Sequence, residues 1–271
     1  MPGYFSILRP SVCLLSAFAI AVGTIVAHAY SVPLYVLYAI IASFLITGAG
    51  NVINDIFDVK IDKINAPHRP IPSGKISKRS ALAYFVILEI VGLLFSVMIN
   101  QNFLIIAIIN SIVLFVYSWK LKKVALIGNA AVSYLAASNF IAAALIIFSF
   151  TSLPFAVIMI SSISFLGTMA RELIKDVADV EGDMAEKSKT LPIIIGKKKT
   201  LAVAFLLLIF AIIYLAVPIY LDIFTYAYLI GAVPAILLSI YAMSKRPEKS
   251  HKYIKLAMYF VILGFVLGAV F

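Results

Sequence analysis

Charged residues are scarce in this sequence. Asp, Glu, Lys and Arg make up only 13% of its 271 residues and the mean hydropathy is +1.09, whereas a soluble domain is typically about 25% charged. This composition excludes an ordinary soluble domain and predicts an all-α integral membrane protein, because a helical span needs roughly 20 apolar residues. Nine such runs, within a single expected transmembrane domain over residues 1–271, begin near residues 11, 34, 81, 103, 125, 153, 200, 223 and 253.

Cysteine and histidine are also rare. Cys13 is the one cysteine and lies in an apolar run, which excludes an intramolecular disulfide and a cysteine metal cluster. His28, His68 and His251 are far apart, and no Ser-His-Asp or Cys-His set accompanies them. We therefore expect no covalent protein nucleophile. The apolar run over residues 12–29 has no obvious cleavage site, so we expect it to remain as a span.

Basic residues are missing from every second loop. With the amino terminus placed in the cytoplasm, all 22 Lys and Arg fall in cytoplasmic segments and none in the outside loops, as the positive-inside rule requires. The pattern predicts a multi-pass cell-membrane protein with its amino terminus and its active site in the cytoplasm and its carboxyl terminus outside. Of the 12 acidic residues, Glu89 and Asp222 alone lie elsewhere. The basic residues are dispersed without a recognition module, so nucleic-acid binding has no support.

The acidic residues form two stripes with the same spacing. The first follows the second apolar run in "NVINDIFDVKID" and the second ends the sixth run in "RELIKDVADVEGD". In both, the intervals of four, three and four residues place all members within about 60° on one face of a helix. The first stripe consists of Asn51, Asp55, Asp58 and Asp62, and the second of Glu172, Asp176, Asp179 and Asp183.

Stacked carboxylates of this kind need a compensating cation, because like charges one helical turn apart destabilise a helix. Solvated helix ends are the simpler explanation for any one of these aspartates alone. Ligands that are all oxygen suit Mg²⁺, which commonly bridges one or two carboxylates to substrate phosphates. Gly182 weakens the last turn of the second stripe, so its helical geometry is the less secure.

Basic and amide side chains near the stripes are candidate phosphate contacts. Arg69 follows the first stripe in "APHRPIPSG", where the prolines predict a fixed non-helical loop. Basic side chains in such places neutralise a diphosphate, although many of them also serve as topology signals. The candidates are Lys63, Arg69, Lys120, Lys122, Arg171, Lys175 and Lys187, with Asn129 at the cytoplasmic end of the fifth run.

The two motifs carry a resemblance to a known family. "NDIFDVKID" and "DVADVEGD" resemble the first and second aspartate-rich motifs of the UbiA superfamily of intramembrane prenyltransferases, which have nine transmembrane helices. The resemblance implies that Tyr117, with Lys120 or Lys122, occupies the place of the family's tyrosine-to-lysine motif, and that Asn54 contacts substrate. Arg9 and Pro10 also look familial. The resemblance further implies a set of catalytic Mg²⁺ ligands that face an isoprenoid diphosphate. These are Asp55, Asp58, Asp62, Asp176, Asp179 and Asp183, with Asn51 as a further ligand.

Within the superfamily, "NDIFDVKIDKINAPHRPIPSG", "ELIKDVADVEGD" and "KTLPIIIG" look most like the archaeal digeranylgeranylglyceryl phosphate synthases. This resemblance implies transfer of a geranylgeranyl group from geranylgeranyl diphosphate to a prenylated glycerol phosphate. It also implies that membrane lipids surround the protein. Two alternatives stay open. One is prenylation of an aromatic acceptor, as in quinone or haem pathways, and the other is a cation-coupled secondary transporter, although two motifs at one membrane face argue against transport.

Overall fold

Helices make up the fold. The computed structural model describes residues 2–29, 31–185 and 188–271, and within these ranges it contains helices and short turns but no strand. The prediction of an all-α protein is therefore confirmed. The elements are α1 (Pro2–Ile7), α2 (Pro10–Val26), α3 (Pro33–Asn65), α4 (Lys78–Val97), α5 (Gln101–Trp119), η1 (Leu121–Lys123), α6 (Ile127–Ala144), α7 (Phe155–Ala178), α8 (Val180–Ala185), α9 (Leu191–Ile195), α10 (Lys197–Tyr220), η2 (Tyr226–Tyr228), α11 (Leu229–Met243) and α12 (Pro247–Val270).

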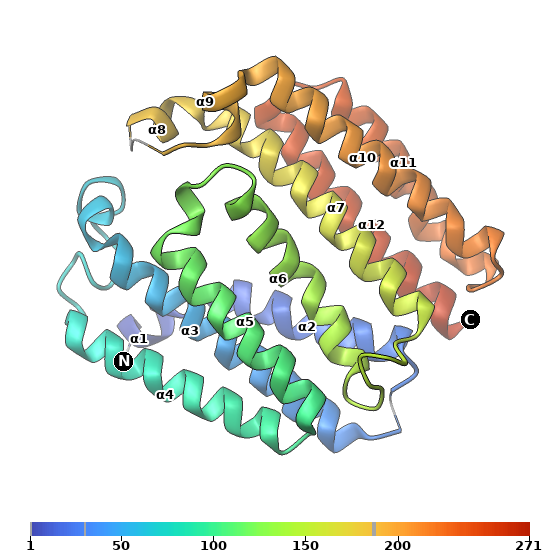
Figure 1. The fold of residues 1–271 in the computed structure, drawn as a ribbon, viewed down its shortest axis with the longest axis horizontal. Coiled ribbons are helices and arrows are strands. Elements are labelled where there is room, and N and C mark those ends of the chain that lie inside the picture. Colours follow the sequence, from blue (N-terminus) through green and yellow to red (C-terminus); the bar gives the residue numbers. More distant parts are fainter. Residues whose placement is uncertain (1, 30, 186–187) are drawn as a thin grey trace. The chain divides into compact units, whose positions relative to one another are not determined.

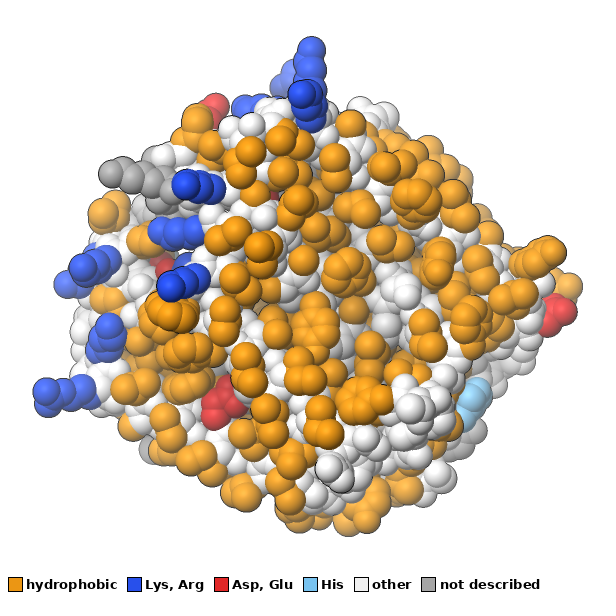
Figure 2. Space-filling view, in the orientation of Figure 1, with side chains coloured by type: hydrophobic (Ala, Val, Ile, Leu, Met, Phe, Trp, Pro, Cys, Tyr) orange, Lys and Arg blue, Asp and Glu red, His pale blue; other side chains and the backbone are white. Residues whose placement is uncertain are grey.

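Among the described residues, eight segments are long and apolar enough to cross a membrane. They coincide with the second to ninth apolar runs of the sequence, and the first run forms α2, a shorter apolar helix of 17 residues. A multi-pass membrane protein is thereby supported, while the count of nine spans stays a prediction. Figure 2 shows the hydrophobic side chains that cover most of the visible face, as expected of a surface in contact with lipid.

The described chain falls into two compact units. The first comprises Met1–Thr24, His28–Lys120 and Ser138–Leu153, and the second comprises Ile25–Ala27, Leu121–Ala137 and Pro154–Phe271. Each aspartate stripe lies within one unit, the first stripe in the first unit and the second stripe in the second. The expectation of a single domain over residues 1–271 stays a prediction.

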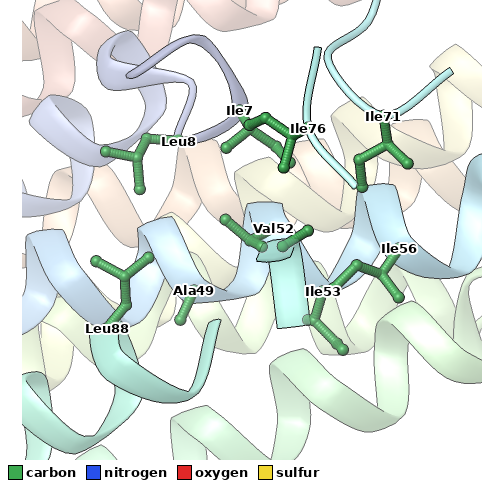
Figure 3. Packing of buried hydrophobic residues seen from close by; sticks show 10 residues of the cluster. Ile7, Leu8, Ala49, Val52, Ile53, Ile56, Ile71, Ile76 and Leu88 are labelled. Atoms are coloured by element: carbon green, nitrogen blue, oxygen red, sulfur yellow. The ribbon is translucent and has the colours of Figure 1, made fainter. Parts of the chain in front are cut away.

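The first unit is built around α3. Helices α4 and α5 pack on α3, and α1 and the loop after α3 lie against it as well (Figures 1 and 3). Helix α3 begins at Pro33, where a missing N–H costs nothing, and Ser77 and Asn100 cap α4 and α5 with their side-chain oxygens. Figure 3 shows the apolar side chains on the motif half of α3 meeting α1, α4 and the loop; the cluster contains Ile7, Leu8, Ala49, Val52, Ile53, Ile56, Ile71, Ile76, Ala81 and Leu88.

The second unit packs α7 against α10 and α12, and α12 against α11. These four helices run side by side in Figure 1. Helices α11 and α12 cross in backbone contact, since a Cβ added to Gly231 would lie only 2.3 Å from the backbone nitrogen of Gly264. Close approach between small residues is a common way for membrane helices to pack, because lipid tails offer no hydrophobic driving force.

Candidate functional site

The first acidic stripe lies on one continuous helix, as predicted. The sequence from Asn51 to Asn65 has neither glycine nor proline, so α3 extends through the motif and ends just before Ala66 and Pro67. Asp55 and Asp62 are buried, and Asn51 and Asp58 are half-buried. This is a costly arrangement for carboxylates unless nearby charges compensate them.

Two arginines compensate the buried aspartates. Nη2 of Arg9 donates to Oδ1 of Asp55, and Nη1 of Arg69 donates to both carboxylate oxygens of Asp62, at 2.7 and 2.6 Å. The same Arg69 nitrogen lies 3.6 Å from Oδ1 of Asp55. These four residues, here called the arginine–aspartate network, carry two positive and two negative charges. Part of the compensation that the sequence assigned to a metal ion is thus supplied by the protein itself.

Arg9 reaches the motif from a break between two helices. Its φ of 51° lies in the left-handed region, which only a few per cent of residues other than glycine adopt, and Pro10 begins α2 directly after it. The carbonyl of Leu8 accepts hydrogen bonds from the Asn51 amide at 2.8 Å and from the Cys13 thiol at 3.1 Å. Asn51 therefore anchors the segment that carries Arg9, a role that spacing on α3 alone did not reveal.

Arg69 is held by the loop that the prolines predicted. Its backbone N–H donates to Ala66, and its carbonyl accepts from Ser73, each at 3.0 Å. Ile71 and Ile76 fix the loop to the first unit's core. Partial burial alone would lower the pKa of Arg69, but the hydrogen bond with Asp62 and the nearby charges of the first stripe outweigh it and raise this pKa. Arg69 therefore remains a permanent cation beside the motif.

The second stripe is not a single helix, and the break lies in the part whose helical geometry the sequence made less secure. Helix α7 ends at Ala178, Asp179 has φ −95° and ψ 6°, and Asp183 lies in the separate helix α8. The break comes before Gly182 rather than at it. The break leaves Asp176 and Asp179 at the carboxyl end of α7, where a carboxylate is unfavourable. It also places Asp183 in the first turn of α8, where a negative charge is favourable.

Asn129 binds the central carboxylate of the second stripe. Its amide Nδ2 donates to Oδ2 of Asp176 at 2.8 Å, and Glu172 and Asp183 lie close enough to repel that carboxylate. Gly128, next to Asn129, lets η1 pass close to the start of α6, because a Cβ there would lie 2.6 Å from the carbonyl oxygen of Leu121. The sequence pointed to Asn129 only as a substrate contact, and not to Asp176 as its partner.

The other predicted site residues have varied surroundings. Arg171 pairs with its neighbour Glu172, and the ammonium of Lys120 lies 4.0 Å from the centre of the Trp119 ring. Asn54, Tyr117 and Lys122 are half-buried, whereas Lys63 and Lys175 are exposed. Lys187 lies outside the described residues. The substrate contacts assigned to these side chains stay predictions.

The oxygen ligands of the two acidic stripes suit a Mg²⁺ ion, but the described residues do not form a closed protein cage around one. Each cluster offers carboxylate and amide oxygens, which are hard ligands. Among the described residues, no group of three or more His, Cys, Asp and Glu side chains is arranged to hold a metal ion. Mg²⁺ in proteins is commonly held by one or two carboxylates together with water and substrate phosphates, so these residues fit a cation that binds along with a phosphate.

Comparison with known proteins gives the family. Residues 14–264 match the UbiA prenyltransferase family. The chain is 36% identical to the digeranylgeranylglyceryl phosphate synthase of Methanosphaera stadtmanae, covering 99% of this chain and 100% of that protein. It is 40% identical to the digeranylgeranylglyceryl phosphate synthase of Methanothrix thermoacetophila, covering 97% of each.

Solved structures share the fold. One that gives structural insight into digeranylgeranylglyceryl phosphate synthase in membranes has a TM-score of 0.88 and 36% identity, covering 99% of this chain and 98% of that one. A UbiA homologue from Archaeoglobus fulgidus, bound to GPP and Mg²⁺, has a TM-score of 0.74 at 18% identity and covers 99% of this chain and 100% of that one. With its helices, its two aspartate-rich motifs and these relatives, the chain belongs to the UbiA prenyltransferase family and is a membrane prenyltransferase.

Proposed function

We propose that the protein transfers a geranylgeranyl group from geranylgeranyl diphosphate to the free hydroxyl of geranylgeranylglyceryl phosphate, and that this transfer depends on Mg²⁺. The observation that carries the proposal is the similarity of 36–40% identity, over nearly the whole chain, to digeranylgeranylglyceryl phosphate synthases. The product would be the lipid core with two ether-linked chains. A prenylated substrate suits an enzyme whose helices offer long apolar surfaces inside a membrane.

The proposed Mg²⁺ ligands are the asparagine and the aspartates of the two acidic stripes. They are Asn51, Asp55, Asp58, Asp62, Asp176, Asp179 and Asp183. Support comes from their oxygen chemistry and from a fold shared with the homologue bound to GPP and Mg²⁺. When bound, Mg²⁺ supplies a positive charge that neutralises a diphosphate as it leaves an allylic carbon. Lys63 and Lys175, both exposed, are proposed to bind the phosphates from the solvent side.

The protein's own residues have three tasks in this reaction. Arg9 and Arg69 place two guanidinium groups beside the first stripe, where a departing diphosphate gains charge. Asn129 keeps Asp176 in one orientation. Apolar side chains of the spans hold the prenyl chains and exclude water from the allylic cation. The amino terminus and both stripes are proposed to face the cytoplasm, and the carboxyl terminus the outside, because of the distribution of the 22 basic residues.

The test is prenyl transfer by the purified protein. Geranylgeranyl diphosphate and Mg²⁺ are supplied with either geranylgeranylglyceryl phosphate or 4-hydroxybenzoate, and each reaction is repeated with excess EDTA. Product from the glycerol phosphate, absent with EDTA, is the expected result. Product from the aromatic acid alone would overturn the lipid assignment and move the protein to the alternative acceptor class. Full activity in EDTA would overturn the metal requirement.

A further inference from the structure

The arginine–aspartate network holds the first stripe in a charge-balanced state. The side chains of Asp55 and Asp62 are 2% and 7% exposed, and each accepts a hydrogen bond from a guanidinium. Oδ1 of Asp55 is contacted by both Arg9 and Arg69. These are the same carboxylates that the proposed function assigns to a divalent cation, so a guanidinium and a metal ion would compete for them.

The two arginines are better placed to move than the two aspartates. Their side chains are 33% and 32% exposed, and neither residue is part of a long helix. Arg9 lies at the break between α1 and α2, with a strained left-handed backbone, and Arg69 lies in the loop between α3 and α4. The aspartates, in contrast, are fixed by the hydrogen-bonded backbone of α3.

A guanidinium that leaves a carboxylate finds an equivalent partner in a diphosphate. Arginine binds carboxylate and phosphate oxygens with the same planar pair of N–H donors. If a divalent cation binds the carboxylates and a diphosphate binds the guanidiniums, each of the four side chains again has a partner of opposite charge. Either ligand alone would leave two like charges without their partners, at sites that are buried or half-buried.

We propose that Arg9 is an exchangeable counter-ion of Asp55, displaced when a divalent cation binds the first stripe and then paired with the diphosphate. Arg69 plays the same part for Asp62. The inference rests on the proposed use of a metal and a diphosphate, and it adds a consequence of its own. The cation and the diphosphate bind cooperatively, and Arg9 both weakens the binding of the cation alone and strengthens that of the diphosphate.

The experiment measures the two ligands separately on the purified full chain. Mn²⁺ binding without substrate is followed by electron paramagnetic resonance, and binding of radiolabelled pyrophosphate at a fixed free Mn²⁺ concentration is followed by equilibrium dialysis. The test variant is Arg9→Gln, which removes the charge but keeps a polar chain. The matched control is Arg79→Gln, which alters an exposed arginine in the same unit. Thermal unfolding and size-exclusion profiles report whether the variants stay folded.

The Arg9→Gln substitution is expected to change the affinities for Mn²⁺ and for pyrophosphate in opposite directions. Arg9→Gln should bind Mn²⁺ about tenfold more tightly and pyrophosphate at least tenfold more weakly than the wild type, with Arg79→Gln unchanged in both. Loss of folding would weaken the binding of both ligands together, so it cannot produce this pattern. Unchanged or weaker Mn²⁺ binding by a folded Arg9→Gln protein would overturn the exchange.

The failure of the proposed function can be distinguished from the failure of the counter-ion exchange. If neither the wild type nor Arg9→Gln binds Mn²⁺, the exchange is overturned, whereas transfer to the glycerol phosphate, measured with and without EDTA, reports on the reaction itself. If Mn²⁺ and pyrophosphate behave as expected but 4-hydroxybenzoate is the acceptor, the exchange stands and only the acceptor assignment fails.

Discussion

The hydrogen bond from Asn129 to Asp176 lends itself to a quantitative test. Asn129→Leu keeps the branched shape of the side chain but removes the donor that lies 2.8 Å from Oδ2 of Asp176. A hydrogen bond to a charged group contributes about 1.5–3 kcal/mol. If Asn129 orients Asp176 in the transition state, loss of the bond should slow prenyl transfer by roughly 10- to 150-fold, since about 1.4 kcal/mol corresponds to a factor of ten.

The assay is single-turnover transfer from geranylgeranyl diphosphate, run on purified protein of matched thermal stability. Ser133→Ala serves as the control, because Ser133 lies one turn further along α6 and donates to the Asn129 carbonyl at 2.7 Å without touching Asp176. The control should keep at least half of the wild-type rate. An Asn129→Leu protein that is folded and as fast as Ser133→Ala would refute the view that this hydrogen bond orients a catalytic carboxylate.

Three further predictions concern the stripes and the membrane helices. Asp55→Ala and Asp176→Ala should each lower prenyl transfer at least 100-fold while the protein stays folded and inserted in membranes; wild-type turnover in either folded variant would contradict the metal-site proposal. Glu89 accepts a hydrogen bond from Ser111 at 2.8 Å between α4 and α5, so Glu89→Gln should leave the thermal midpoint almost unchanged, and a large drop would mean that its charge is required. Gly264→Leu should cost about 1–3 kcal/mol of stability through overpacking and so lower the thermal midpoint markedly, because a Cβ at this position would lie 2.8 Å from the Tyr228 carbonyl oxygen. An unchanged melting curve would contradict the packing of α11 on α12.

Sequence patterns predicted the fold well where the signal was local. A long apolar run defines a membrane helix by itself, so the positions of the helices followed from composition. The continuous helix of the first stripe was also predicted correctly, because no helix-breaking residue interrupts the chain between Asn51 and Asn65. The proline-rich stretch around Arg69 formed the expected loop for the same kind of reason.

The second stripe differs in structure from the first, because equal spacing does not ensure equal structure. Asn51 begins the first stripe as an amide, and arginines compensate Asp55 and Asp62, so its helix tolerates the charge. The second stripe has four carboxylates, and α7 ends in the middle of them. The two stripes therefore differ in the charges that surround them, and the spacing of a stripe does not contain that information.

Two of the contacts that give the stripes their character join residues that are distant in sequence. Arg9 and Asp55 are 46 residues apart, and Asn129 and Asp176 are 47 apart, so neither pair has a periodic signature in the sequence. The two carboxylates are also stabilised in different ways, Asp55 by cations and Asp176 by a neutral amide among other acids. Removing them should consequently have different effects on stability. Asp55→Ala leaves Arg9 without its partner, whereas Asp176→Ala relieves repulsion from Glu172 and Asp183. Of two variants that are equally inactive, the second is therefore expected to be the more stable.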